Sequence, residues 1–176
     1  MLYKMREDEF EKVFAIMLKA FPIDERRTFD EQKALLSNTV FEIFVCKDGE
    51  NGEIKGFIST YRFDGFCFVE HFAVDAKYRN MGLGHEILQE LKMRCGMILL
   101  EVEPPTSEQA KRRIAFYERN GFNLNDYAYT QPPISAHTKP IPLMIMTTDA
   151  TLSEDEFFAA KSTLYKHVYN VECDAY

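Results

Sequence analysis

The turn Arg79–Gly84 constrains the fold more than any other segment, because it separates a strand-like run from a helical stripe. Before the turn, Phe66–Val74 is rich in Phe and Val and predicts a strand. After it, apolar residues recur at helical spacing, at Leu83, Ile87, Leu88 and Leu91. The chain must therefore form a strand, a glycine-containing turn and a helix in immediate succession.

The two glycines of this turn, Gly82 and Gly84, let backbone N–H groups approach a ligand with no Cβ in the way. These groups lie at the positive end of a helix dipole, and Arg79 adds a cation, so the turn is suited to bind phosphate. The segment lacks the G-K-[ST] of a Walker loop and the third glycine of a dinucleotide-binding loop. Taken alone, it is equally compatible with a plain structural turn.

The first half of the chain predicts strands and two capped helices. A short strand at Leu2–Arg6 precedes a helix that an Asp8–Glu11 capping box opens, and Thr28 with Glu31 opens a shorter helix through about Ser37. Three strands follow, and the turn signals between them predict an antiparallel meander. Their ranges are Phe41–Lys47, Ile54–Phe63 and Phe66–Val74.

The second half alternates strands and helices, which predicts a parallel crossover. A strand at Met97–Val102 leads to a helix that is capped by Thr106 with Gln109 and ends at Asn120-Gly121; strands at Phe122–Thr130 and Leu143–Thr147 follow. Ser153 with Glu156 predicts a C-terminal helix whose apolar stripe is Phe157, Leu164, Tyr165 and Val168. This stripe must pack on its own domain or on a second copy, so a homodimer is one expectation.

Composition excludes several classes of partner and site. At 176 residues and 46% hydrophobic, the chain suits one domain, and its net charge of −7 argues against a nucleic-acid or anionic-membrane partner. It has no apolar run long enough to span a bilayer and no signal-peptide core near Met1, so a cytoplasmic location is expected. The scattered cysteines predict neither a metal site nor a disulfide: Cys46, Cys67, Cys95 and Cys173. Cys46 and Cys67 are interpreted as small apolar residues inside strands.

Three segments in order carry a resemblance to a known family: Val69–Gly84, Leu99–Val102 and Ala115–Phe122. Together they resemble the GCN5-related N-acetyltransferase (GNAT) core over roughly residues 40–125. The resemblance implies a mixed α/β fold, with a mostly antiparallel central sheet of about seven strands flanked by helices, and an added C-terminal helix at about 153–170. It also implies one domain over 1–176, acetyl-CoA as cosubstrate, and direct attack by a primary amine of a small molecule or peptide.

By the same resemblance, the family signature R/Q-x-x-G-x-G/A falls on Arg79, Gly82 and Gly84. The residues expected to bind coenzyme A are Phe72, Ala73, Val74, Arg79, Asn80, Met81, Gly82, Leu83, Gly84 and His85. The amide of Val74 is expected to polarise the thioester carbonyl. The start of the helix that follows Met97–Val102 departs from the family's common pattern at Ala110, where members often carry an asparagine.

The resemblance also suggests catalytic residues. Tyr117 matches a tyrosine that faces the CoA sulfur and is expected to be the general acid, with core packing as its other interpretation. The base stays open: Glu101 matches a glutamate of the peptide-N-terminal branch, and Glu70 and His71 lie on the strand before the turn. Strand alternation predicts that Glu70 and His71 point to opposite faces. For His71 a hydrogen-bonded structural role is the alternative.

Two further classes of function stay open at this point, a non-catalytic acyl-CoA sensor and an interaction protein that uses its acidic surface and C-terminal helix. The acceptor pocket is expected to come from Phe21–Thr28, Tyr61–Gly65 and Gln131–Pro142. Their residues suit a polyamine, an aminoglycoside, an amino acid or a peptide end equally well.

Overall fold

The computed structural model describes residues 1–172, so Cys173 and the expectation attached to it lie outside the described residues. The chain has two compact units, Met1–Ile98 and Leu99–Tyr176. The single domain expected over the whole chain stays a prediction.

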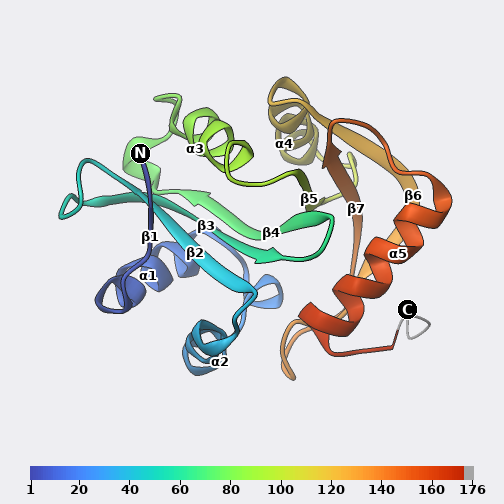
Figure 1. Ribbon diagram of the computed structural model, residues 1–176, viewed down its shortest axis with the longest axis horizontal. Coiled ribbons are helices and arrows are strands. Elements are labelled where there is room, and N and C mark those ends of the chain that lie inside the picture. Colours follow the sequence, from blue (N-terminus) through green and yellow to red (C-terminus); the bar gives the residue numbers. More distant parts are fainter. Residues whose placement is uncertain (173–176) are drawn as a thin grey trace. The chain divides into compact units, whose positions relative to one another are not determined.

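The first unit holds four antiparallel strands in the order β1–β2–β3–β4 (Figure 1). They are β1 (Leu2–Lys4), β2 (Phe41–Lys47), β3 (Ile54–Arg62) and β4 (Phe66–Val74). The predicted bounds of β2 and β4 are confirmed, β3 ends one residue early, and β1 is shorter than expected. The predicted antiparallel meander is therefore confirmed.

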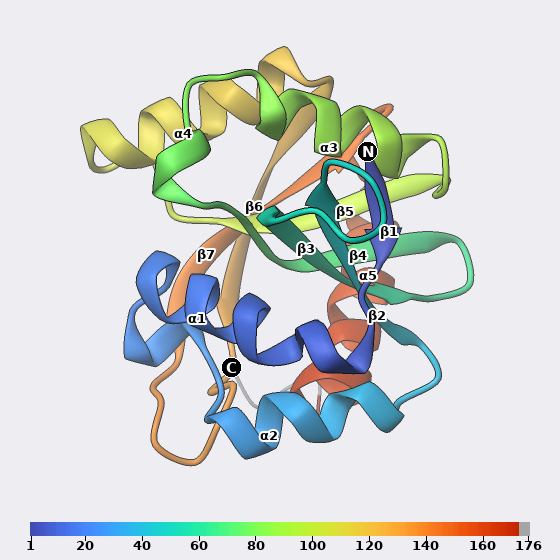
Figure 2. The ribbon, with the colours of Figure 1, turned by 90° about the vertical axis from the view of Figure 1, so that its left-hand side faces the viewer.

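Helices cover both faces of this four-stranded sheet. Helices α1 (Phe10–Ala20) and α2 (Phe29–Ala34) lie on one face, and α3 (Leu83–Lys92) lies on the other (Figure 2). The Thr28–Glu31 box is confirmed, because Thr28 Oγ1 accepts the Glu31 N–H at 3.3 Å. The predicted Asp8–Glu11 box is wrong: Asp8 lies in a 3-10 turn, and the Glu9 carboxylate accepts the Arg6 N–H at 2.9 Å.

In the second unit, β7 (Ile141–Thr148) pairs antiparallel with both β5 (Met97–Val102) and β6 (Phe122–Gln131). Strands β5 and β6 therefore run parallel, and α4 (Glu108–Arg119) connects them as the predicted crossover. The cap is corrected: Ser107, not Thr106, accepts the Ala110 N–H at 3.0 Å. With helices packed on seven strands among the described residues, the predicted mixed α/β class is confirmed.

The C-terminal segment continues from α5 (Glu154–Leu164) into a π-helical turn, η5 (Tyr165–Tyr169). The Ser153–Glu156 capping box is confirmed. Phe157 and Leu164 on its apolar face are buried within this chain, and the Phe157 ring stacks on Tyr127 at 4.6 Å. Because this apolar face is covered within the chain, it gives no argument for a second copy. The homodimer stays a prediction.

Cys46 and Cys67 are buried free thiols within β2 and β4, which confirms their interpretation as interior residues. Over residues 1–172, no helix combines the length and apolar character that a membrane crossing requires. Within the same residues, no three His, Cys, Asp or Glu side chains gather as metal ligands would.

Candidate active site

The turn before α3 has the backbone geometry of an anion cradle. Asn80 and Gly82 both adopt the left-handed conformation, at φ 63° and 81°, and Gly82 is the N-cap residue of α3. Gly82 suits this position because it carries no Cβ, whereas asparagine tolerates it better than most residues. The first N–H groups of any helix have no intrahelical acceptor, so the start of α3 is suited to an anionic ligand. Met81 at the tip is 65% exposed.

The residues just before this turn fix its shape. Asp75 Oδ1 accepts the Lys77 N–H at 3.0 Å, and the Tyr78 hydroxyl donates to Glu53 at 2.8 Å. Arg79 Nε donates to the carbonyl of Val74 at 3.2 Å. Arg79 is therefore held against the end of β4, at the entrance to the cradle.

The end of β4 presents a backbone N–H away from its partner strand. Asp75 N–H donates to the carbonyl oxygen of Lys55 in β3 at 2.8 Å. Because successive strand residues point their N–H groups in alternate directions, that of Val74 points away from β3. Phe72 shares this direction, whereas Ala73, which is 8% exposed, pairs with Phe57 of β3. The Val74 amide thus has the direction that the resemblance requires, away from β3.

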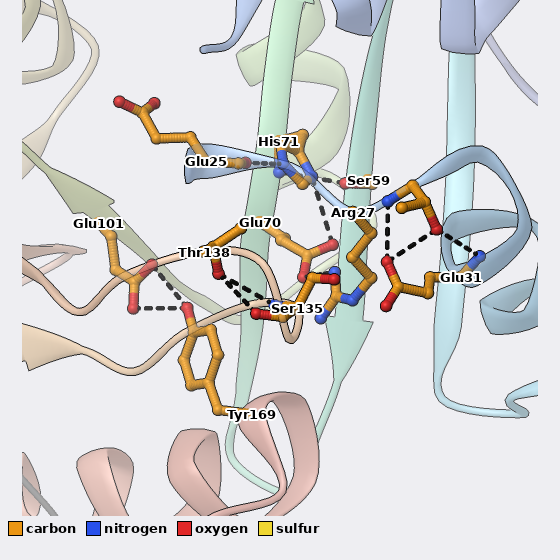
Figure 3. Close-up of polar contacts among 11 residues, drawn as sticks. Glu25, Arg27, Glu31, Ser59, Glu70, His71, Glu101, Ser135, Thr138 and Tyr169 are labelled. Atoms are coloured by element: carbon orange, nitrogen blue, oxygen red, sulfur yellow. Dashed lines mark hydrogen bonds and ion pairs between the residues drawn. The ribbon is translucent and has the colours of Figure 1, made fainter. Parts of the chain in front are cut away.

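A bulge in β4 brings Glu70 and His71 together (Figure 3). Ser59 pairs with His71 while Thr60 pairs with Val69, so Glu70 is the extra residue of β4. Such a bulge breaks the alternation of side chains. His71 Nδ1 consequently lies 3.3 Å from Glu70 Oε2, and the predicted placement of these two side chains on opposite faces is wrong.

Glu70 forms a buried ion pair with Arg27, whose Nη1 lies 2.6 Å from Glu70 Oε1. The two side chains are 2% and 7% exposed. Burial alone would raise the pKa of Glu70, but the positive charge of Arg27 and the neighbouring His71 outweigh it and lower the pKa to about 2. A carboxylate that holds its charge so firmly is a weak proton acceptor.

Both the ring and the backbone of His71 make contacts within the first unit. Its Nε2 lies 2.8 Å from the Glu25 carbonyl, and because a carbonyl only accepts, Nε2 carries the proton. Its backbone N–H donates to Ser59 Oγ at 3.0 Å, and the Phe21 ring packs edge-on at 4.7 Å. These contacts match the structural interpretation of this histidine. They also tie two residues of Phe21–Thr28 to β4.

In the second unit, Glu101 on β5 is held by two phenols. The Tyr169 hydroxyl lies 2.8 Å from both carboxylate oxygens (Figure 3). The Tyr129 hydroxyl of β6 also donates to Oε1. Tyr129 and Tyr169 are 4% and 6% exposed, whereas Glu101 is half-buried. Glu101 is thus an oriented carboxylate.

Tyr117 lies on α4 and is 8% exposed, with its ring 5.5 Å from that of Phe122. Burial raises the pKa of this phenol to about 12, against an opposing effect of Arg113. Tyr117 therefore stays protonated at neutral pH. Its packing and a role as proton donor are compatible with each other.

Two residues of these clusters escaped the sequence interpretation. Arg27 carried no signal, because no periodicity relates it to Glu70, which is 43 positions away. Tyr169 directly follows Val168, the last residue of the predicted apolar stripe. Nothing in the residue spacing indicated that its hydroxyl would donate to Glu101.

Comparison with known proteins bears on this geometry. The model of the acetyltransferase (GNAT) domain matches residues 40–124, which include the whole cradle and Tyr117. A solved GNAT-family structure from Bacteroides thetaiotaomicron superimposes with a TM-score of 0.89 at 29% identity, covering 98% of this chain and 99% of that one. The chain belongs to the GNAT family. As a member, it is an acyl-CoA-dependent N-acetyltransferase.

Two other similarities agree with GNAT membership. YjbC of Bacillus subtilis (strain 168), which is named among the acetyltransferases, is 26% identical over 152 residues, or 85% of this chain and 77% of that protein. The ribosomal-protein-S18-alanine N-acetyltransferase of Escherichia coli has a TM-score of 0.62 at 20% identity, covering 88% of this chain and 96% of that one. At this identity the second likeness shows the fold alone.

Proposed function

We propose that this GNAT protein transfers the acetyl group of acetyl-CoA to a primary amine of a small molecule or peptide by direct attack. The observation that carries the proposal is the cradle, in which Asn80 and Gly82 are both left-handed and open onto the first turn of α3. Backbone N–H groups in this arrangement suit the pyrophosphate of coenzyme A. The full set of residues proposed to bind coenzyme A is Phe72, Ala73, Val74, Arg79, Asn80, Met81, Gly82, Leu83, Gly84 and His85.

The proposed chemistry has three steps. A base removes the proton of the ammonium, and the neutral nitrogen attacks the thioester carbonyl. The C–S bond then breaks, the CoA thiolate leaves, and the nitrogen gives up its second proton to solvent as the amide forms. A lysine-like amine with a pKa of about 10.4 requires roughly 4–5 kcal/mol for deprotonation at neutral pH. The site must supply much of that through a base and a desolvated environment.

Of the two glutamates, we assign the base to Glu101. Glu70 is neutralised by Arg27 at 2.6 Å and is fully enclosed, whereas Glu101 is half-buried and accepts hydrogen bonds from two neutral phenols. We assign Tyr117 as the donor to the departing thiolate. A thiolate of pKa near 8.5 takes a hydrogen bond from such a phenol more readily than its whole proton, since burial raises the pKa of Tyr117 to about 12.

The acceptor is proposed to be an amine whose ammonium form is drawn to Glu101. A peptide α-amino group, with a pKa of about 7.7–8.0, would need only roughly 1 kcal/mol for deprotonation. The structurally similar E. coli protein, by its name, acetylates an alanine of ribosomal protein S18. Peptide N-termini and small primary amines therefore form the first panel to assay.

Substitution at the cradle tests the donor site. Gly82→Ala is expected to weaken acetyl-CoA binding about tenfold or more, because a Cβ enters the space that the pyrophosphate would fill. Gly49→Ala is the matched control: Gly49 has φ +71°, Gly82 has φ +81°, and an added Cβ would meet no protein atom within 4 Å at either. Both variants should lose about 1 kcal/mol of stability. Isothermal titration with acetyl-CoA measures the difference.

Equal acetyl-CoA affinity in Gly82→Ala and Gly49→Ala would contradict the assignment of the cradle. Tight binding in the wild type without turnover of any amine would instead support the acyl-CoA sensor.

A further inference from the structure

The C-terminal segment reaches Glu101 although it lies outside residues 40–124, the part of the chain that matches the GNAT domain. Tyr169 is the last residue of the π-helical turn η5, 68 positions from Glu101. Its hydroxyl is 2.8 Å from each carboxylate oxygen. Because a carboxylate can only accept, the phenol is the donor in this contact.

The π-helical turn separates two tyrosines that have different acceptors. The Tyr165 hydroxyl donates to the backbone carbonyl of Thr130, whereas the Tyr169 hydroxyl reaches Glu101. Val171 N–H donates to Tyr165 O at 2.9 Å, and Asn170 ends the turn in the left-handed conformation at φ 56°. A π-helical turn is rare and is found frequently at functional sites. Here the turn places the Tyr165 hydroxyl at a backbone carbonyl and the Tyr169 hydroxyl at the proposed base.

A second phenol donates to the same carboxylate. The Tyr129 hydroxyl, from β6, donates to Glu101 Oε1. Burial and the nearby charge of Glu101 raise the pKa of Tyr129 well above its usual value, so this phenol remains a donor throughout the working pH range. Two neutral donors stabilise the ionised carboxylate and restrict its rotation, without adding a positive charge that would repel an ammonium substrate.

We propose that Tyr169, together with Tyr129, is a positioning residue that keeps Glu101 ionised and aimed for catalysis, so that the C-terminal segment is part of the catalytic apparatus. The inference rests on the proposed function in one respect, the role of Glu101 as base. The hydrogen-bond geometry itself does not depend on that role.

Tyr169→Phe tests the inference, with Tyr165→Phe as its matched control. Both changes remove one buried hydroxyl from the same turn: that of Tyr169 donates to Glu101, and that of Tyr165 donates to the Thr130 carbonyl. In Tyr169→Phe the acid limb of the kcat/KM profile should move upward by about one pH unit. In addition, kcat should fall about tenfold while the KM for acetyl-CoA is unchanged. Tyr165→Phe should lower the melting temperature and leave the position of the acid limb unchanged.

A second readout needs no substrate. In protein labelled with ¹³C at glutamate carboxyl carbons, the Glu101 resonance is assigned by its loss in Glu101→Gln. Its titration midpoint should be higher in Tyr169→Phe than in the wild type and in Tyr165→Phe. If no amine is acetylated, the proposed function fails, but this titration still decides whether Tyr169 lowers the pKa of Glu101.

An unchanged Glu101 titration in Tyr169→Phe would overturn the inference, as would equal losses of kcat in both phenylalanine variants with no movement of the acid limb. Should Tyr169→Phe fail to fold, Tyr129→Phe removes the other donor and is judged by the same two readouts.

Discussion

At the scale of single residues, the buried pair of Arg27 and Glu70 has a direct energetic consequence. Glu70→Gln would leave the guanidinium buried without the carboxylate that lies 2.6 Å away. Removal of one member of such a pair costs about 3–5 kcal/mol. Glu108→Gln, which breaks an exposed pair with Lys111 at 3.0 Å, should cost less than about 1 kcal/mol. Urea unfolding of the two variants at neutral pH measures both.

The same pair predicts an acid dependence of stability. Because the folded pKa of Glu70 is lowered to about 2, its contribution is present above the unfolded pKa of about 4.3 and is lost as the pH falls toward 2. The loss should approach about 3 kcal/mol and be absent from Glu70→Gln. Parallel stability curves for wild type and Glu70→Gln below about pH 5 would contradict the ion-pair account.

What the sequence predicts at this scale is local. The two glycines and Arg79 are contiguous, so the cradle could be predicted from their spacing and from the resemblance. The Arg27–Glu70 and Tyr169–Glu101 contacts join distant segments, and no local pattern encodes such partners. The alternation rule was wrong at Glu70 because a bulge adds one residue to β4 and leaves no trace in hydrophobic periodicity.

At the scale of elements, the Ser153 cap starts the helix that leads to the π-helical turn. Ser153 N–H donates to Glu156 Oε2 at 2.8 Å, and Ser153 Oγ accepts the Glu156 N–H at 3.4 Å. Ser153→Ala should cost about 1 kcal/mol of unfolding free energy. Ser162→Ala, at an exposed position within α5, should change stability by less than about 0.5 kcal/mol. Urea midpoints that coincide for the two variants would argue against the cap.

Elements were predicted well where pattern and cap agreed and less well where several cap residues compete. The bounds of β2, β4 and β5 were correct, because each is a mostly apolar run between turn signals. At α4, Thr106 and Ser107 are adjacent hydroxyl residues, and the sequence does not decide which one takes the extended conformation of an N-cap. The π-helical turn was missed because its residues also fit an ordinary helical stripe.

At the scale of the whole molecule, the fold class and family followed from the order of motifs, since a strand, the cradle, a strand and a helix ending in Asn-Gly occur in a fixed sequence. The acceptor did not follow, because the segments expected to form its pocket are loops whose side chains suit several amines. The B. thetaiotaomicron likeness extends over 98% of the chain, so the C-terminal segment that carries Tyr169 belongs to a fold shared with another protein.

The most direct test of the account is mass spectrometry of the amine together with thiol release from acetyl-CoA. The panel contains a polyamine, an aminoglycoside, free amino acids and peptides with free N-termini. We predict that one class gains an acetyl group on nitrogen with release of one CoA per amide. Turnover should fall strongly in Tyr117→Phe, whereas acetyl-CoA binding persists. Acetate as the sole product, or no product from any amine despite bound acetyl-CoA, would contradict the proposed function.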